Sequence, residues 1–274
     1  MYGDLDPYKM AASAIDEAVR NAVCVGADPK TIVLLDNFCW GNTERPETLG
    51  SLVEAARACY DVAIAYKMPF ISGKDSLNNE FRPPNGEPIS IPPTLLISAM
   101  GQIEDVSKCV TMDLKRAGNR LFRLGHTYDE LGGSHFNLVQ NLHGGIVPKL
   151  DTLHARVFYE TLHTAMIRGL VRSAHDMSEG GLAVAIAEMC IASGLGATLI
   201  DDCVLDKVTL FSESNSQFVI EIEPEHTTEI RSLFEGLPIC YLGTVTAEPV
   251  LSFGDLFSVS VDELKTAWQK PLDW

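Results

Sequence analysis

Four residue types suited to phosphate chemistry stand in a row at Gly73, Lys74, Asp75 and Ser76. They follow an apolar run that begins at Pro69, and this pattern predicts a buried strand that ends in a polar turn. Glycine lets backbone N–H groups approach a ligand, lysine brings a positive charge, aspartate offers an oxygen to a metal and serine a hydroxyl. The same residues are also common in ordinary turns, so this stretch alone does not decide between the two interpretations.

A second candidate lies within residues 171–189, VRSAHDMSEGGLAVAIAEM. The pattern predicts a short strand, a turn and an apolar helix, with Asp176 at the strand end and Gly180 and Gly181 at the helix start. Bare N–H groups and the positive end of a helix would then share a crevice with a carboxylate, which suits a metal-bridged phosphate. An ordinary capped turn explains the stretch about equally well.

The third candidate is a carboxylate and an amide on one helix. Asp6 and Pro7 predict a helix start, and the helix is expected to run to Val25. Glu17 and Asn21 stand four residues apart, so both could offer an oxygen to one cation; a solvated carboxylate beside an amide is the alternative. On this helix we expect the face with Ala11, Ala14, Ile15, Ala18 and Ala22 to be buried, and Lys9, Ser13, Asp16 and Arg20 to face water.

The elements around these residues form an alternating pattern. A strand is predicted at residues 31–35, which leaves Asp36 at its end, where carboxylates of α/β proteins meet ligands. A helix from Pro46 to about Met68 and a strand at residues 94–103 are also predicted, with the loop 82–90 before that strand. The first part of the chain therefore predicts an α/β layer with a small sheet, one face of which another copy or another segment has to cover.

A polar, glycine-containing segment at residues 115–119 predicts a division into domains 1–115 and 116–274. In the second part, strands are expected at 120–125, 171–176, 197–200, 218–223, 239–245 and 250–253, and helices at 151–170, 181–189, 224–234 and 261–269. His154 and His163 are expected on a helix surface, since no ligand-like spacing surrounds them. The fold class is α/β (α+β), a small sheet domain followed by an αβ domain with a mixed sheet.

The composition excludes several function classes. The formal net charge is −16 over 274 residues, which disfavours nucleic acid and anionic membranes as partners. An anionic ligand would need a bridging cation, local Lys or Arg, or a helix N-terminus. No apolar run approaches the roughly 20 residues that span a bilayer, and the first residues lack a signal-peptide pattern. The seven cysteines form no CxxC pair, which predicts reduced thiols and a cytoplasmic protein.

Four motifs, DEAVRNAVCVGADP, LLDNFCWGNTERPE, PFISGKDSLNNEF and AHDMSEGGLAVAIAEM, occur in this order. Through them the chain closely resembles the C-terminal half of phosphoribosylformylglycinamidine synthase, of the superfamily that includes aminoimidazole ribonucleotide synthase. The resemblance implies two domains of the aminoimidazole ribonucleotide synthase type, the first forming half of a barrel and truncated at its start. It also implies that a matching N-terminal half belongs to the complete enzyme.

The implied reaction is the ATP-dependent conversion of formylglycinamide ribonucleotide to its amidine with glutamine-derived ammonia, a step of purine biosynthesis. The resemblance implies that Asp36, Gly73 and Lys74 contact ATP and that Ser76 contacts the substrate. Lys74 stands where many short-form members carry a magnesium-binding asparagine, and because a lysine cannot ligate magnesium, we expect it to contact phosphate directly. Asp75 receives no role.

The resemblance implies a second nucleotide site, which binds Mg²⁺ and ADP. Glu17, Asn21 and Asp176 resemble its magnesium ligands, and Ser178 would lie near the nucleotide. By the internal pseudo-repeat of the family, Glu213, Ser214 and Asn215 resemble a substrate loop. The catalytic histidine is expected in the other half, and His175 belongs to a different motif.

Three functions follow as alternatives. The chain could supply part of a ligase and be inactive alone, with the other half and a glutaminase domain or subunit as partners. It could instead be a structural module that binds Mg-ADP without turnover, or a stand-alone kinase or synthetase of the same superfamily. An exposed sheet edge could also pair two copies into a homodimer.

Overall fold

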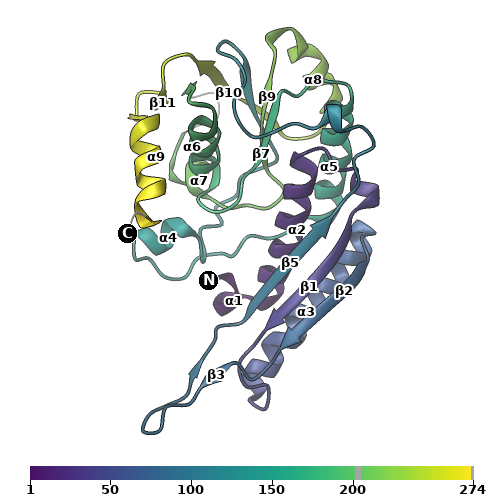
Figure 1. Ribbon diagram of the computed structural model, residues 1–274, viewed down its shortest axis with the longest axis vertical. Helices are drawn as coiled ribbons and strands as arrows, with labels where there is room; N and C mark the ends of the chain where they lie inside the picture. Colours follow the sequence, from purple (N-terminus) through teal and green to yellow (C-terminus); the bar gives the residue numbers. More distant parts are fainter. Residues whose placement is uncertain (201–204, 273–274) are drawn as a thin grey trace.

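Helix α2 (Pro7–Cys24) lies at the centre of the molecule, between two sheets built from different parts of the chain (Figure 1). The computed structural model describes residues 1–200 and 205–272. Within these residues a three-stranded sheet, called the small sheet, has the order β2-β1-β5, and a seven-stranded large sheet has the order β12-β11-β8-β10-β6-β9-β7; β3 and β4 form a separate hairpin.

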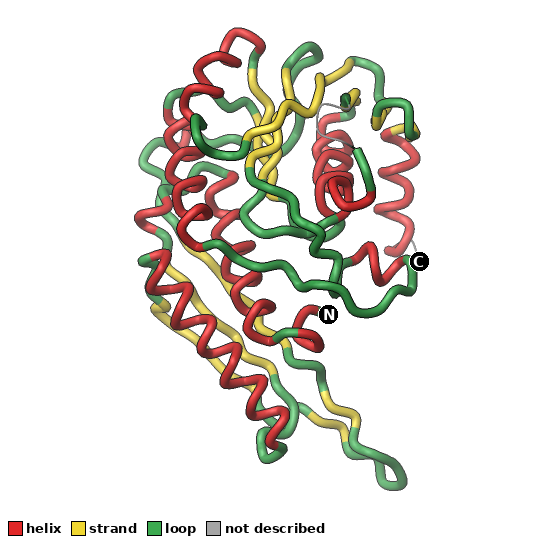
Figure 2. Tube along the Cα trace, turned by 180° about the vertical axis from the view of Figure 1, so that it is seen from behind, coloured by secondary structure: helices red, strands yellow, loops and turns green. Residues whose placement is uncertain are grey.

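The small sheet is made of β1 (Val33–Cys39), β2 (Phe70–Ser76) and β5 (Thr94–Met100). Strand β1 runs parallel to β2 and antiparallel to β5. Helices α2 and α3 (Pro46–Tyr66) cover one face of this sheet, and the opposite face is open (Figures 1 and 2). The short helix α1 (Tyr2–Leu5) precedes α2, and the hairpin of β3 (Glu80–Phe81) and β4 (Ile89–Ser90) extends from one end of the sheet.

The large sheet is mixed, as the sequence predicted. Its strands are β6 (Arg120–Leu124), β7 (Ser173–Asp176), β8 (Gly196–Leu199), β9 (Phe218–Ile222), β10 (Ile239–Thr246), β11 (Val250–Phe253) and β12 (Phe257–Ser260). The accompanying helices are α4 (His135–Val139), α5 (Thr152–Ile167), α6 (Gly181–Ser193), α7 (Lys207–Phe211), α8 (Thr227–Leu233) and α9 (Val261–Gln269). Strand β12 was not predicted, because its apolar-polar alternation extends over only four residues, FSVS.

Two strand ends differ from the prediction. Asp36 lies within β1, which continues to Cys39, and the Gly73–Ser76 stretch lies within β2. Both polar segments are extended because each pairs with the other: Asp36 is in register with Gly73, and Cys39 with Ser76. Strand pairing satisfies the backbone N–H and C=O groups of these segments. They are therefore strands, although their polar side chains are typical of turns.

The environment of α2 also differs from the prediction. Asp16 is fully buried and Arg20 is 2% exposed, whereas the helical pattern placed both in water. Helix α2 contacts α3 and β5 on one side and α5 and β7 on the other, so its polar face packs against the second half of the chain. A surface stripe on an isolated helix becomes buried when a second layer covers it, provided its charges are paired.

Asp16 is the centre of a buried network that joins both halves of the chain. Its carboxylate accepts hydrogen bonds from Arg20 Nε at 2.9 Å, from the Tyr66 hydroxyl at 2.6 Å and from the Tyr159 hydroxyl. The backbone N–H and the hydroxyl of Ser216 each donate to it at 2.8 Å. Helices α2, α3 and α5 and the loop before β9 therefore meet at one carboxylate.

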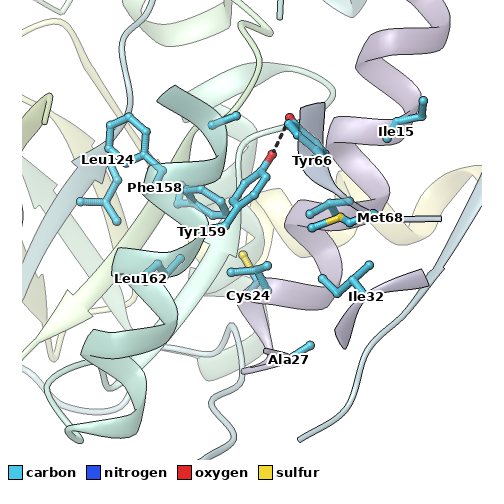
Figure 3. Packing of buried hydrophobic residues seen from close by; sticks show 14 of the residues in the cluster. Ile15, Cys24, Ala27, Ile32, Tyr66, Met68, Leu124, Phe158, Tyr159 and Leu162 are labelled. Carbon is cyan, nitrogen blue, oxygen red and sulfur yellow. Dashed lines mark hydrogen bonds between the residues drawn. The ribbon is translucent and has the colours of Figure 1, made fainter. Parts of the chain in front are cut away.

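Apolar packing surrounds this network. Tyr66 and Tyr159 meet edge to face, with ring centroids 5.7 Å apart, and their hydroxyls lie 3.4 Å apart (Figure 3). Met68 and Phe158 pack in the same cluster, which is continuous from the small sheet to β6 and β9. The two halves thus share one core.

The predicted hinge at residues 115–119 is tied to the large sheet. The buried carboxylate of Glu221 on β9 accepts hydrogen bonds from Lys115 N at 2.8 Å and from Asn119 Nδ2 at 2.7 Å. Ser173 Oγ donates to the same group at 2.8 Å. The division between domains 1–115 and 116–274 stays a prediction, and the segment between them is anchored.

The thiol prediction holds in part. Cys24, Cys39, Cys59, Cys109 and Cys190 are free, while Cys203 lies outside the described residues. Cys240 is disulfide-bonded, so the expectation of a reduced thiol is wrong there, because sequence spacing does not show which sulfur atoms meet. In the part of the chain that the structure describes, no helix is both long and apolar enough to span a bilayer.

We predict that Asp16→Ala lowers the free energy of unfolding by about 3–5 kcal/mol, because it leaves the buried Arg20 guanidinium without its nearest counter-charge. Urea unfolding followed by circular dichroism measures the change. The control Glu160→Ala removes a partly exposed ion pair with Arg156 on α5 and should cost about 0.5 kcal/mol or less. A loss below about 1 kcal/mol for Asp16→Ala would show that the network is not a main source of stability.

Candidate functional site

A cavity of about 330 Å³ lies where α2 meets the second half of the chain. Its wall includes Glu17 and Arg20 from α2, Ser178 from the turn after β7, and Glu213 and Asn215 from the loop before β9. The lining also includes Tyr2, Gly133, His135, Glu179 and the first residues of β5. We call this space the interdomain pocket.

The carboxylate of Asp176 lies beside this pocket, at the end of β7. When the Asn21 amide is assigned with its nitrogen toward this carboxylate, that nitrogen donates to Oδ1 at 2.8 Å and to Oδ2 at 3.2 Å. Ser178 Oγ donates to Oδ2, and His175 Nδ1 lies 3.2 Å from Oδ1. Burial opposes ionisation, but the hydrogen bonds from His175 and Ser178 and the charge of Arg20 lower the pKa of Asp176 to about 2, so the group is ionised at neutral pH.

The pKa of Glu17 shifts in the opposite direction to that of Asp176. Burial raises its pKa to about 7, and repulsion from Glu179, Asp176 and Asp16 adds to this, while Arg20 opposes it. The pocket wall therefore concentrates negative charge around one guanidinium. Arg20 Nη1 lies 3.3 Å from Ser178 Oγ and 3.9 Å from Asp176 Oδ2, which partly neutralises that charge.

The residue types of this cluster fit a hard divalent cation. Glu17 and Asp176 supply carboxylate oxygens, and a half turn of the Asn21 amide would present its oxygen to the same place. Such an ion would also relieve the repulsion that raises the Glu17 pKa. Among the described residues, no three His, Cys, Asp or Glu side chains are grouped to hold a metal, so a cation here needs the amide and further ligands from water or phosphate.

Glu213 organises the turn before α6. Its Oε1 accepts hydrogen bonds from the backbone N–H groups of Gly180 at 2.9 Å and His135 at 2.8 Å, and the Tyr2 hydroxyl donates to its Oε2. The Gly181 N–H donates to the Ser178 carbonyl. The expectation of bare N–H groups at the helix start is therefore wrong for this structure, because a buried carboxylate already occupies that position.

Ser214 and Asn215, the two residues after Glu213, lie in different surroundings. Ser214 is buried, donates to Glu130 Oε2 at 2.8 Å and accepts from the Tyr128 N–H at 3.0 Å. Asn215 lines the interdomain pocket, and its amide donates to Ser13 Oγ at 3.0 Å. Of these three residues, Glu213 and Asn215 reach the pocket wall, and Ser214 supports the loop from behind.

Asp36, Gly73, Lys74 and Ser76 form a second group on the small sheet, outside the interdomain pocket. The Asp36 carboxylate lies directly over Gly73, where an added Cβ would come within 2.3 Å of its Oδ1. Register places Lys74 and Ser76 on the opposite, open face, where Lys74 Nζ donates to Ser76 Oγ at 2.7 Å. The four residues are thus split between two faces of one sheet.

Sequence reasoning missed several residues of the pocket wall. Arg20 was assigned to water, and Tyr2 and His135 were given no role, yet both contact Glu213. The pair Gly132 and Gly133, just upstream of His135, was a usable sequence signal for a tight turn. Gly133 does adopt a φ of 73°, which favours glycine. The two expected helix-surface histidines, His154 and His163, do not line the pocket.

Comparison with known proteins places this geometry in a family. The family model for the C-terminal domain of AIR synthase related proteins matches residues 116–255, and the model for their N-terminal domain matches residues 1–103. The chain belongs to the AIR synthase related family. The resemblance inferred from the four motifs is confirmed, as is the two-domain mixed α/β fold class.

Curated relatives are phosphoribosylformylglycinamidine synthase subunits PurL. That of Deinococcus radiodurans is 37% identical over 284 residues, and that of Thermoplasma volcanium is 33% identical over 275 residues. Each alignment covers 98% of this chain, which spans 37% and 35% of the length of these relatives.

Solved structures share the fold. Thermotoga maritima PurL complexed with FGAR has a TM-score of 0.74 at 18% identity, covering 95% of this chain and 43% of the other. A HypE–HypF complex has a TM-score of 0.68 at 14% identity, covering 91% of this chain and 83% of the other.

We predict that Glu17→Gln changes how stability depends on pH. Because the folded pKa of Glu17 is raised from 4.5 to about 7, ionisation disfavours the folded state, and the free energy of unfolding falls as pH rises through this range. The glutamine variant lacks this fall and should be more stable than the parent at pH 8 by about 2 kcal/mol. Urea midpoints between pH 4.5 and 8 measure the difference.

The matched control for this experiment is Glu235→Gln, at an exposed position in the turn after α8. It should leave the pH profile parallel to that of the parent chain. Identical profiles for Glu17→Gln and the parent would contradict the raised pKa of Glu17.

Proposed function

We propose that the chain forms part of an ATP-dependent ligase that converts formylglycinamide ribonucleotide to formylglycinamidine ribonucleotide with glutamine-derived ammonia. The relatives that support this are named phosphoribosylformylglycinamidine synthase subunits and match nearly the whole chain. The observation that carries the proposal is the two separate groups of polar side chains, one on the small sheet and one at the interdomain pocket. A cytoplasmic location and a place in purine biosynthesis belong to the same proposal.

The group on the small sheet is proposed to form one wall of the ATP and substrate cleft. Asp36 and Gly73 would contact the nucleotide, Lys74 a phosphate, and Ser76 the substrate. The exposed ammonium group of Lys74 and its hydrogen bond to Ser76 support a phosphate contact, because the pair lies on the open face of the sheet. The opposite wall would come from the part of the relatives that this chain does not span.

The interdomain pocket is proposed as the second nucleotide site, which takes Mg-ADP. Glu17, Asn21 and Asp176 would hold the cation, and Ser178 would lie near the phosphates. The oxygen-rich donor set and the repulsion at Glu17 support a cation at this position. Because the charged groups of the wall are mainly the carboxylates of Glu17, Glu179 and Glu213, a nucleotide without a cation should be repelled. The assignment of Glu213, Ser214 and Asn215 to a substrate loop also remains a proposal.

The proposed partners are a second half, corresponding to the part of the relatives that this chain does not span, and a glutaminase domain or subunit. One related structure is titled as PurLQS from Thermotoga maritima, which supports assembly with further subunits. The open face of the small sheet carries exposed Leu96 and Met100, which that second half, or a second copy of this chain in a homodimer, would cover.

A structural nucleotide-binding module is the second candidate function. The buried network around Asp16 favours it, because a ligand in the interdomain pocket would bind beside the contacts that join the two halves. Asp36, Gly73 and Ser76 separate the two functions. Their substitution in a complete enzyme should lower turnover if they line the catalytic cleft, and change mainly stability if the chain is structural.

A stand-alone kinase or synthetase of the same superfamily is the third candidate. In the HypE–HypF complex, the fold covers 83% of the matched chain, so it occurs in a chain of similar size. Turnover of ATP by this chain without any partner would favour that candidate.

We predict that the chain binds Mg-ADP and that the Glu17→Ala, Asp176→Ala double variant binds it at least tenfold more weakly, because two anionic ligands are lost. Isothermal calorimetry measures both affinities. The double variant Glu225→Ala, Glu229→Ala controls for the change in net charge; Glu225 lies in the 3-10 turn before α8, Glu229 lies in the first turn of α8, and neither lines the pocket. Equal affinity for the parent and the Glu17, Asp176 variant would refute the assignment of these ligands.

We also predict that the chain alone has no synthase activity, because one wall of the proposed cleft would come from the part of the relatives that this chain does not span. Amidine formation from formylglycinamide ribonucleotide, Mg-ATP and ammonia is the measurement. Turnover by the purified chain that is lost on Gly73→Ala would contradict this expectation and show that the site is complete.

A further inference from the structure

Arg20 is the one Lys or Arg side chain among the described residues that line the interdomain pocket. The side chain is 3% exposed, and hydrogen bonds hold its guanidinium in place. Nε donates to Asp16 at 2.9 Å, and Nη1 donates to the Met177 carbonyl oxygen and lies 3.3 Å from Ser178 Oγ. The position of the guanidinium is therefore fixed before any ligand binds, which lowers the entropy cost of a further contact.

The Nη2 atom of the same guanidinium has no hydrogen-bond partner among the described residues. It is also not fully enclosed, because the enclosed polar side-chain atoms without a partner, in the part of the chain that the structure describes, are Asn119 Oδ1 and Arg123 Nε. Nη2 therefore reaches accessible space, and the space that Arg20 lines is the interdomain pocket. Guanidinium N–H groups in such a position are suited to phosphate oxygens.

Several other donors of the pocket wall are already engaged. The backbone N–H groups of Gly180 and His135 both donate to Glu213. The Ser178 hydroxyl donates to a neighbouring carboxylate. A phosphate group that enters the pocket would therefore find unengaged and positively charged N–H groups at Arg20.

The charges around Arg20 require a cation for this contact. Burial acts to lower the pKa of Arg20, but Asp16 and Asp176 raise it above its ordinary value, so the guanidinium is charged. These two carboxylates offset its charge, and Glu17 and Glu179 add negative charge to the wall. A phosphate without a metal would therefore be repelled, whereas a divalent cation at Glu17 and Asp176 would offset both of these carboxylates.

We propose that Arg20 binds a phosphate group of the metal-bound nucleotide in the interdomain pocket. The inference rests on the proposed Mg-ADP site and goes beyond it, because it adds a phosphate contact to the cation ligands. Since the same guanidinium donates to Asp16, a bound phosphate is also connected to the network that joins the two halves of the chain.

Arg20→Lys tests this contact, because a lysine keeps a positive charge beside Asp16 and lacks the second terminal nitrogen. We expect the variant to raise the dissociation constant for Mg-ADP about tenfold and to leave that for Mn²⁺ alone within about twofold of the parent value. Calorimetry measures the first constant, and electron paramagnetic resonance of free Mn²⁺ measures the second. The matched control Arg156→Lys, on α5 and outside the pocket lining, should change neither constant.

The double variant Asp16→Asn, Arg20→Gln provides the test if Arg20→Lys does not fold, because it removes both charges of the buried pair together. It should bind Mg-ADP at least tenfold more weakly than the parent, with little change for Mn²⁺. Equal Mg-ADP affinity of the parent and the folded variant would overturn the proposal. An equal loss of Mn²⁺ and Mg-ADP affinity would also overturn it, since Arg20 would then act only by positioning Asp176.

The parent chain separates this inference from the proposed nucleotide site. A parent that binds no Mg-ADP would refute the site itself, and the phosphate contact with it. A parent that binds Mg-ADP as tightly as Arg20→Lys does would leave the site intact and refute the role of Arg20 alone.

Discussion

The carboxylate of Asp16 is the constraint on which the arrangement of the two halves depends. A buried ion with no partner is strongly unfavourable, so Arg20, Tyr66, Tyr159 and Ser216 must all be in place around it. Because these groups come from α2, α3, α5 and the loop before β9, pairing them fixes how the small sheet lies against the large one.

The interdomain pocket follows from that constraint. Arg20 bridges from Asp16 to the turn after β7, where it contacts Ser178 and approaches Asp176. Glu17, one residue after Asp16, is thereby held at the pocket wall beside other carboxylates, and this proximity helps to raise its pKa. One side of α2 thus joins the two halves, and the neighbouring side gives the pocket its negative charge.

Much of the fold was predictable from local pattern. The helices starting at Pro7, Pro46 and Gly181 were predicted from caps and apolar spacing, since their first residues carry strong signals. The polar segments of β1 and β2 were mistaken for turns, because strand pairing between distant residues overrode the local preference of Gly73 and Asp36. The burial of Asp16 was also missed, because a helical pattern cannot show that a second layer will cover the polar face.

The candidate site was predictable in its residues and less so in its arrangement. Motif resemblance selected Glu17, Asn21, Asp176 and Ser178. In the structure Glu17 and Ser178 line the interdomain pocket, and Asn21 and Asp176 lie beside it. The motif resemblance did not indicate that the Glu213 carboxylate would accept hydrogen bonds from the backbone N–H groups of Gly180 and His135. These contacts depend on tertiary packing.

A crystal structure of this chain grown with Mg²⁺ and ADP tests the central claim most directly. The account predicts the nucleotide in the interdomain pocket, with the cation bound by Glu17, Asn21 and Asp176 and the phosphates near Ser178. A nucleotide bound elsewhere, or a cation that does not contact these three residues, would contradict it.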